Sequence, residues 1–239
     1  MAEADEISPE QAVEEIRRII DSRKYFFCAN YRDVRFDFQE HYDTPELDTW
    51  RHEVCLCIFF GLYQAAITAT NHLLESFLKY ALVYYYSRPW RNPDQIDSTA
   101  GIMQILQQAH QRVDNLNLEN TIDRACSLGI IAKSDKTELK RLKDTFRNAY
   151  SHASKKKLLG NTPIKMIPGK ISEDGRLDIE SPLEVPVGSN PLVAWMAQLE
   201  HAKAMAMPYF LYLDDLIRRT LATLYSDAPP VNSAEVDKP

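Results

Sequence analysis

Residues 54–82 have the sequence VCLCIFFGLYQAAITATNHLLESFLKYAL, the longest apolar stretch of this 239-residue chain. Polar and charged residues interrupt the stretch at Gln64, Thr68, Asn71, His72, Glu75 and Lys79. These interruptions predict a buried helix and argue against a membrane span. A helix start signal, Thr44-Pro45-Glu46, lies upstream, so we expect helical periodicity from there to about Tyr86, with a bend near Gly61.

Helix signals continue on both sides of this stretch. Ser8-Pro9-Glu10-Gln11 has the features of a capped helix start and opens a helix to about Asp21. Shorter helices are expected at 99–112 and 118–128, and Asn190-Pro191 begins a long final helix that ends near Tyr225. Residues 25–38 are aromatic-rich and alternate near their end, which predicts a short strand or an extended arm.

The remaining pattern is that of a small β-hairpin. Ile164–Ile171 and Arg176–Ile179 flank a Glu173-Asp174-Gly175 turn. The sequence therefore predicts an all-α fold with a long central helix and a hairpin insertion at about 155–190. We expect an N-terminal helix and arm over 1–43, a helical domain over 44–225 and a disordered tail over 226–239.

The composition is that of an ordinary globular protein, 45% hydrophobic and 26% charged. Residues 1–7 are acidic and lack an apolar core, so no secretory signal is expected. The four cysteines, Cys28, Cys55, Cys57 and Cys126, form no disulfide-like framework, which favours a reducing cytoplasm. Seven glycines are too few for a sheet-rich fold with many tight turns.

The charge is unevenly distributed along the chain. Residues 131–170 contain eleven lysines and arginines against three acidic residues, a local charge of +8, whereas the rest of the chain carries −14. This asymmetry indicates one anion-binding surface on an acidic body. The alternative is a solvated helix face beside a lysine-rich loop.

Within this window a capped amphipathic helix is expected to begin at Ser134. Its buried stripe contains Leu139, Leu142, Phe146, Ala149, Tyr150 and Ala153. A second stripe lies beside the first, with its basic members exposed or at a groove; it contains Lys136, Lys140, Lys143, Arg147 and Ser151. Lys155, Lys156 and Lys157 follow and either track a phosphate backbone or form a solvated loop.

The helix ends in Arg147-Asn148-Ala149-Tyr150-Ser151-His152. Arginine presents a planar fork of donors that suits phosphate, and a neutral histidine can take a proton near pH 7. The spacing by itself arises easily by chance, so the alternative is two surface residues near a helix end, where positive charge is favourable. The basic surroundings favour a site.

These six residues resemble the Arg–polar–x3–His signature of HEPN (higher eukaryotes and prokaryotes nucleotide-binding) domains. The segment Asn71–Lys79 is similar to the long helix that precedes the motif helix in that family, and Glu75 matches its acidic position. The resemblance covers about 47–225 and implies a helical, metal-independent endoribonuclease of a toxin–antitoxin or phage-defence system. A subgroup of these toxins has a tyrosine two residues after the histidine, where this chain has Ser154.

RNA can be cleaved by attack of its own 2′-hydroxyl on the adjacent phosphate, which needs a base, an acid and charge stabilisation. We expect His152 to be the base, Arg147 to bind the phosphoryl oxygens and Asn148 to orient the imidazole or the substrate. Lys143, Ser151 and the three lysines at 155–157 are the expected RNA contacts, with Glu75 and Tyr150 in support. Arg147 and His152 are about 140° apart on an ideal helix, so a homodimer with a composite cleft is predicted.

Other functions are also compatible with the sequence. A non-catalytic RNA-binding or adaptor module that dimerises through the same helices is the main alternative, and a purely structural partner protein is another. Tyr84-Tyr85-Tyr86 and Trp90, near Arg88 and Arg91, either stack on bases or close a helix end against the core. His52, Cys55 and Cys57 have poor geometry for zinc on one helix. No cofactor or metal is expected.

Overall fold

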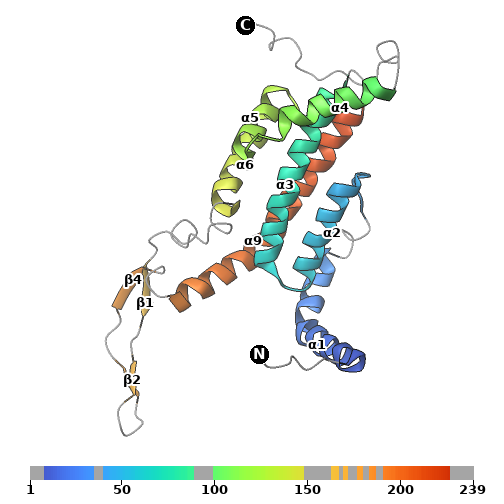
Figure 1. The fold of residues 1–239 in the computed structure, drawn as a ribbon. Helices are drawn as coiled ribbons and strands as arrows, with labels where there is room; N and C mark the ends of the chain where they lie inside the picture. Colours follow the sequence, from blue (N-terminus) through green and yellow to red (C-terminus); the bar gives the residue numbers. More distant parts are fainter. Residues whose placement is uncertain are drawn as a thin grey trace, which may run out of the picture.

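The computed structural model describes residues 8–34, 40–88, 99–147, 163–166, 169–171, 177–179, 183–186 and 191–226. Most of these residues are helical, which confirms the predicted all-α class. Three helices form the centre: α2 (Pro45–Phe59), α3 (Tyr63–Tyr86) and α9 (Pro191–Tyr225). Figure 1 shows α3 and α9 side by side, with α2 along one flank and α5 and α6 along the other.

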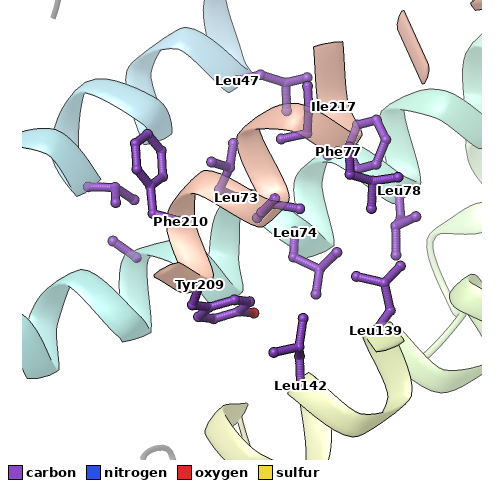
Figure 2. Close-up of a cluster of buried hydrophobic side chains, with 14 of the residues drawn as sticks. Leu47, Leu73, Leu74, Phe77, Leu78, Leu139, Leu142, Tyr209, Phe210 and Ile217 are labelled. Carbon is purple, nitrogen blue, oxygen red and sulfur yellow. The ribbon is translucent and has the colours of Figure 1, made fainter. Parts of the chain in front are cut away.

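Two hydrogen bonds define how α3 and α9 lie together. The Tyr209 hydroxyl donates to Asn71 Oδ1 at 2.9 Å, and the hydroxyls of Tyr80 and Tyr225 are 2.9 Å apart. Both numbers rise along both helices, so α3 and α9 run parallel. Between them lies the hydrophobic core drawn in Figure 2, where Leu73, Leu74 and Phe77 are fully buried. The long apolar stretch is therefore the centre of the fold, as predicted.

The expected bend near Gly61 is a complete break between two helices. Gly61 has φ +69°, a left-handed conformation that glycine adopts without strain. A Cβ atom at this position would lie 2.5 Å from the Phe26 ring. Helix α2 therefore ends at Phe59, and α3 begins at Tyr63 and runs back along it.

The N-terminal helix is longer than the sequence pattern predicted. Helix α1 runs from Pro9 to Val34, so the strand or arm expected from residue 25 is wrong for 25–34, and residues 35–39 lie outside the description. The reason is packing against α2. Phe27 stacks on Phe59 with ring centroids 4.8 Å apart, and Asn30 Nδ2 donates to the Ile58 carbonyl at 2.7 Å.

A second group of helices covers the other flank of α3: α4 (Thr99–Val113), α5 (Leu118–Ser127) and α6 (Lys133–Leu142). The predicted cap of α6 at Ser134 is wrong, because Ala132 is the N-cap. The Asp135 carboxylate accepts from the Ala132 N–H at 3.3 Å. Two bonds of 2.6 and 3.0 Å from Arg219 also hold this carboxylate, and so fix α6 against α9.

A buried ionic cluster joins α2 to α9. Arg51 is 2% exposed, and its Nε donates to Asp214 Oδ1 at 2.8 Å. Tyr42 donates to the same oxygen at 2.5 Å, and Arg218 Nε donates to Asp214 Oδ2 at 2.8 Å. These bonds tie residues before α2 to the helical core.

Four short strands lie apart from the helices in Figure 1. β1 (Pro163–Met166) pairs with β4 (Leu183–Pro186), and β2 (Gly169–Ile171) pairs with β3 (Leu177–Ile179), both antiparallel. The predicted turn at 173–175 lies outside the described residues, as does the tail from 227.

Candidate functional site

Arg147 is the last described residue of the motif helix, and it is held by the central helix. Its Nη2 lies 4.0 Å from Glu75 Oε2, and Glu75 also pairs with Lys79 at 3.3 Å. The Arg147 side chain is 38% exposed. The structure thus brings together two predicted site residues that are far apart in sequence, and leaves the Arg147 side chain partly exposed.

The turn that carries Arg147 is a π-helical turn, Lys143–Arg147, which follows α6 directly. Such turns are rare and occur often at functional sites. Phe146 anchors this one, because it is fully buried and stacks on Tyr209 with centroids 4.7 Å apart. Together with Leu139 and Leu142, it confirms the described part of the predicted buried stripe.

Asn71 is a residue near this site that sequence reasoning passed over. It lies one turn before Glu75 on α3 and is 6% exposed. Its Oδ1 accepts from Tyr209, whereas its Nδ2 is buried and has no hydrogen-bond partner among the described residues. A buried amide nitrogen without a partner is uncommon. The sequence signal was its polarity within an otherwise apolar face of α3.

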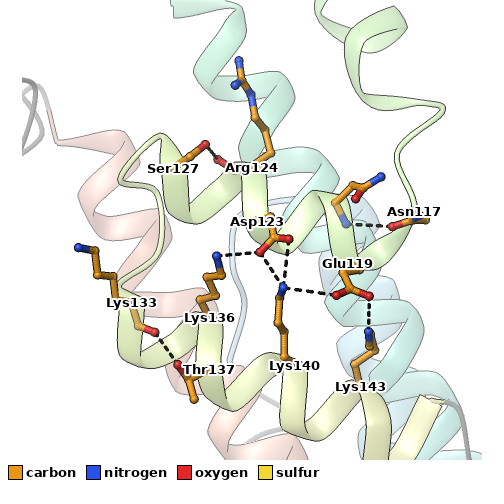
Figure 3. A network of polar contacts seen from close by, with 11 residues as sticks. Asn117, Glu119, Asp123, Arg124, Ser127, Lys133, Lys136, Thr137, Lys140 and Lys143 are labelled. Carbon is orange, nitrogen blue, oxygen red and sulfur yellow. Dashed lines mark hydrogen bonds and ion pairs between the residues drawn. The ribbon is translucent and has the colours of Figure 1, made fainter. Parts of the chain in front are cut away.

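The second, basic stripe of α6, expected to be exposed or at a groove, faces the neighbouring helix α5, and Lys136 and Lys140 remain partly exposed there. Lys136 and Lys140 each lie 2.9 Å from Asp123 of α5, and Lys143 lies 2.8 Å from Glu119. Figure 3 shows these lysines reaching across to the two carboxylates. Three ammonium groups and two carboxylates leave a net charge of only +1 on this surface, so α6 offers less to an anion than its sequence indicates.

Of the three lysines that face α5, Lys143 has the least exposed side chain. Its side chain is 11% exposed, because the π-helical turn directs it towards α5. Its ammonium is also 3.5 Å from Asp144. Its assignment as an RNA contact stays a prediction, and binding a phosphate there requires exchange of Glu119.

This network predicts acid sensitivity. Hydrogen bonds from Lys143 and then Lys140 lower the pKa of Glu119, and bonds from Lys136 and Lys140 lower the pKa of Asp123. Carboxylates with a lowered pKa contribute stability above their unfolded values, about 4, and lose it as the pH falls through the folded values. We expect the urea midpoint of the wild type to fall more between about pH 7 and pH 3 than that of Glu119→Gln/Asp123→Asn. Equal falls would contradict this role of the network.

The other predicted site residues lie outside the described residues. They are Asn148, Tyr150, Ser151, His152, Lys155, Lys156 and Lys157. Their positions relative to Arg147 therefore stay predictions.

A groove of about 730 Å³ opens beside Arg147, between α3 and α4. Glu75 lies at its edge and so touches both the groove and the arginine. The α3 wall includes His72, Ser76 and Tyr80, which repeat every four residues along one face of the helix. The volume is within the range of ligand sites.

Two further features concern ligands and membranes. Cys55 is buried and His52 exposed, and nowhere in the described ranges do three His, Cys, Asp or Glu side chains gather as a metal site requires. Among the helices that the structure describes, none is long and apolar enough to cross a bilayer.

Comparisons of the chain with protein-family models, with curated proteins and with solved structures gave no match.

Proposed function

We propose that this protein is a metal-independent endoribonuclease of the HEPN type, acting in the cytoplasm in a toxin–antitoxin or anti-phage defence system. The observation that carries the proposal is Arg147, a partly exposed arginine at the end of a π-helical turn, paired with Glu75 of the central helix. The helical architecture supports the resemblance. RNA is the substrate, and an antitoxin or a defence-system protein is the expected partner.

In the proposed reaction, His152 takes the proton of the 2′-hydroxyl, which then attacks the adjacent phosphorus. The bond to the 5′-oxygen breaks, leaving a cyclic phosphate and a 5′-hydroxyl. Arg147 stabilises the charge on the phosphoryl oxygens, for which its donor fork is suited. Asn148 orients the imidazole or the substrate, Tyr150 supports the helix, and Ser151 and the lysines at 155–157 contact the strand.

The proton that the 5′-oxygen needs requires an acid, and one chain supplies one such histidine. We therefore infer a homodimer in which two copies of Arg147 and His152 share a cleft. An apolar stripe on the first half of α9 supports this inference. Leu192, Trp195, Met196 and Leu199 are 63%, 53%, 54% and 36% exposed, although they are large apolar residues.

The cleavage assay tests the nuclease directly. Purified protein is incubated with single-stranded RNA in excess EDTA, beside Arg147→Ala and His152→Ala. Because Arg147 stabilises developing charge, we expect its loss to slow cleavage by about 100- to 1,000-fold, and His152→Ala to be inactive. Products should carry cyclic phosphate and 5′-hydroxyl ends.

Lys133→Ala is the matched control, since it removes one exposed cation from the start of the same helix and should cleave normally. Melting temperatures establish that the variants are folded. Binding without cleavage would identify the alternative, a non-catalytic RNA-binding module. Cleavage that requires a metal ion, or that survives Arg147→Ala, would sink the proposal.

A further inference from the structure

The groove lies between α3 and the second half of α4, a helix with few buried residues. Among the α4 residues, only Ala109 and Val113 are buried. Towards its N-terminus, Leu106 is half-buried and Met103 is 62% exposed. The second half of α4 supplies Leu106, His110 and Val113 to the groove, opposite His72, Ser76 and Tyr80 of α3, and these side chains leave the space between them open.

The charge of the groove argues against a phosphate as its occupant. Glu46, Glu75 and Asp114 contribute three carboxylates to the lining, whereas Lys79 contributes one ammonium. This ammonium is already paired with Glu75 at 3.3 Å. Carboxylates repel phosphate and accept hydrogen bonds from N–H groups, so the groove suits a neutral group that carries amino donors.

The aromatic part of the groove suits a flat ring. Tyr80 and Tyr84 line it and stack on each other with centroids 6.1 Å apart. The Tyr80 hydroxyl is bonded to Tyr225, whose own hydroxyl lies 3.1 Å from Thr44 Oγ1. Val83 and Leu106 add apolar surface. The two rings are thus fixed from behind, which lowers the entropy lost when a ligand stacks against them.

The position of the groove beside Arg147 indicates which kind of flat ring it would bind. Glu75 borders the groove and lies 4.0 Å from the Arg147 guanidinium, so a strand whose phosphate lies on Arg147 has a base beside the groove. We propose that the groove holds one unpaired, amino-bearing nucleobase of that RNA strand. Aromatic stacking and hydrogen bonding at the base edge are the usual means of reading single-stranded RNA. The inference rests on the proposed function, because it places the phosphate on Arg147.

The test measures binding without cleavage. Fluorescent 2′-O-methyl octamers of adenosine, cytidine or uridine have identical phosphates and lack the 2′-hydroxyl needed for attack. We expect the adenosine and cytidine octamers to bind more tightly than the uridine octamer, because their bases carry amino groups. Ser76→Phe, which fills the groove, should weaken adenosine binding by about tenfold or more, the size expected when a base loses its stacking partner.

Gln108→Phe is the matched control, since it adds the same ring at an exposed position of α4 and should bind as the wild type does. Glu46→Ala/Asp114→Ala changes only exposed groove residues, so it folds whether or not Ser76→Phe does. It should lose the preference for adenosine over uridine. Equal binding of the three octamers by the wild type would overturn the proposal, and so would an unchanged preference in the double variant.

The outcomes separate this proposal from the nuclease. If the base preference depends on the groove but ordinary RNA is not cleaved, the groove binds a base and the protein is not a nuclease. If cleavage depends on Arg147 but is unchanged in folded Ser76→Phe, the protein is a nuclease and the groove does not bind the base. Binding of octalysine that the adenosine octamer does not displace would identify a site for a cationic peptide and would also overturn the proposal.

Discussion

Replacing Asp214 by alanine is expected to lower the free energy of unfolding by about 3–5 kcal/mol, because it leaves a buried charge without its partner. Arg51 is 2% exposed and donates to Asp214 through its Nε. Burial raises the pKa of Asp214, but hydrogen bonds from Tyr42 and Arg218 outweigh that effect and keep the pKa below its usual range. The carboxylate is therefore charged at neutral pH, and the alanine variant loses the counter-charge of Arg51.

Urea unfolding measures this loss. Asp215→Ala is the matched control, because Asp215 is the next residue of α9, is 75% exposed and pairs with Arg219 at 3.1 Å. Surface pairs contribute about 0–1 kcal/mol, so the control should change little. The double variant Arg51→Met/Asp214→Leu removes both charges and should be more stable than Asp214→Ala. Similar losses in Asp214→Ala and Asp215→Ala would show that the buried cluster has no special role.

Local signals predicted the helices whose ends they mark. Pro45 and Pro191 begin α2 and α9 as expected, and α3 ends at Tyr86 where the periodicity does. The aromatic residues from Tyr25 did not mark a strand, because they lie in a helix where Phe26 packs on Tyr63 of α3 and Phe27 on Phe59 of α2. These contacts are between distant segments and have no local signature.

Only part of the candidate site could be predicted, because its geometry also depends on contacts between distant segments. The sequence indicated Arg147 and Glu75 as site residues, but their approach depends on how α6 docks against α3. The local charge of +8 was counted over residues 131–170 only. It therefore leaves out Glu119 and Asp123, which lie before this window and pair with its lysines. Their four-residue spacing matches that of Lys136 and Lys140, and this match was the signal that could have shown the pairing. The groove is formed by loose packing of α4, which no residue pattern predicts.

The dimer is expected to dissociate when the stripe on α9 is made acidic. Leu192, Trp195, Met196 and Leu199 lie on the helical face that is buried further along, at Ala206 and Phe210. The same apolar face thus continues from the core to exposed positions. Figure 1 shows that the first half of α9 extends past the start of α3. A second copy of the chain would cover this face, and exposed tryptophan is typical of residues that dominate binding energy.

Trp195→Glu/Met196→Glu should therefore raise the dimer dissociation constant by about 30-fold for each side chain that acts as a hot spot. Light scattering measures the dissociation, and RNA cleavage should fall with it, because half of the composite cleft is lost. The specific activity of this double variant should drop on dilution, at concentrations where the wild type remains dimeric. Met103→Glu changes a 62% exposed residue of α4, a helix that Figure 1 shows away from the first half of α9, and should change neither property. A wild type that is monomeric yet cleaves RNA, or a monomeric variant with full activity, would mean that one chain holds the complete site.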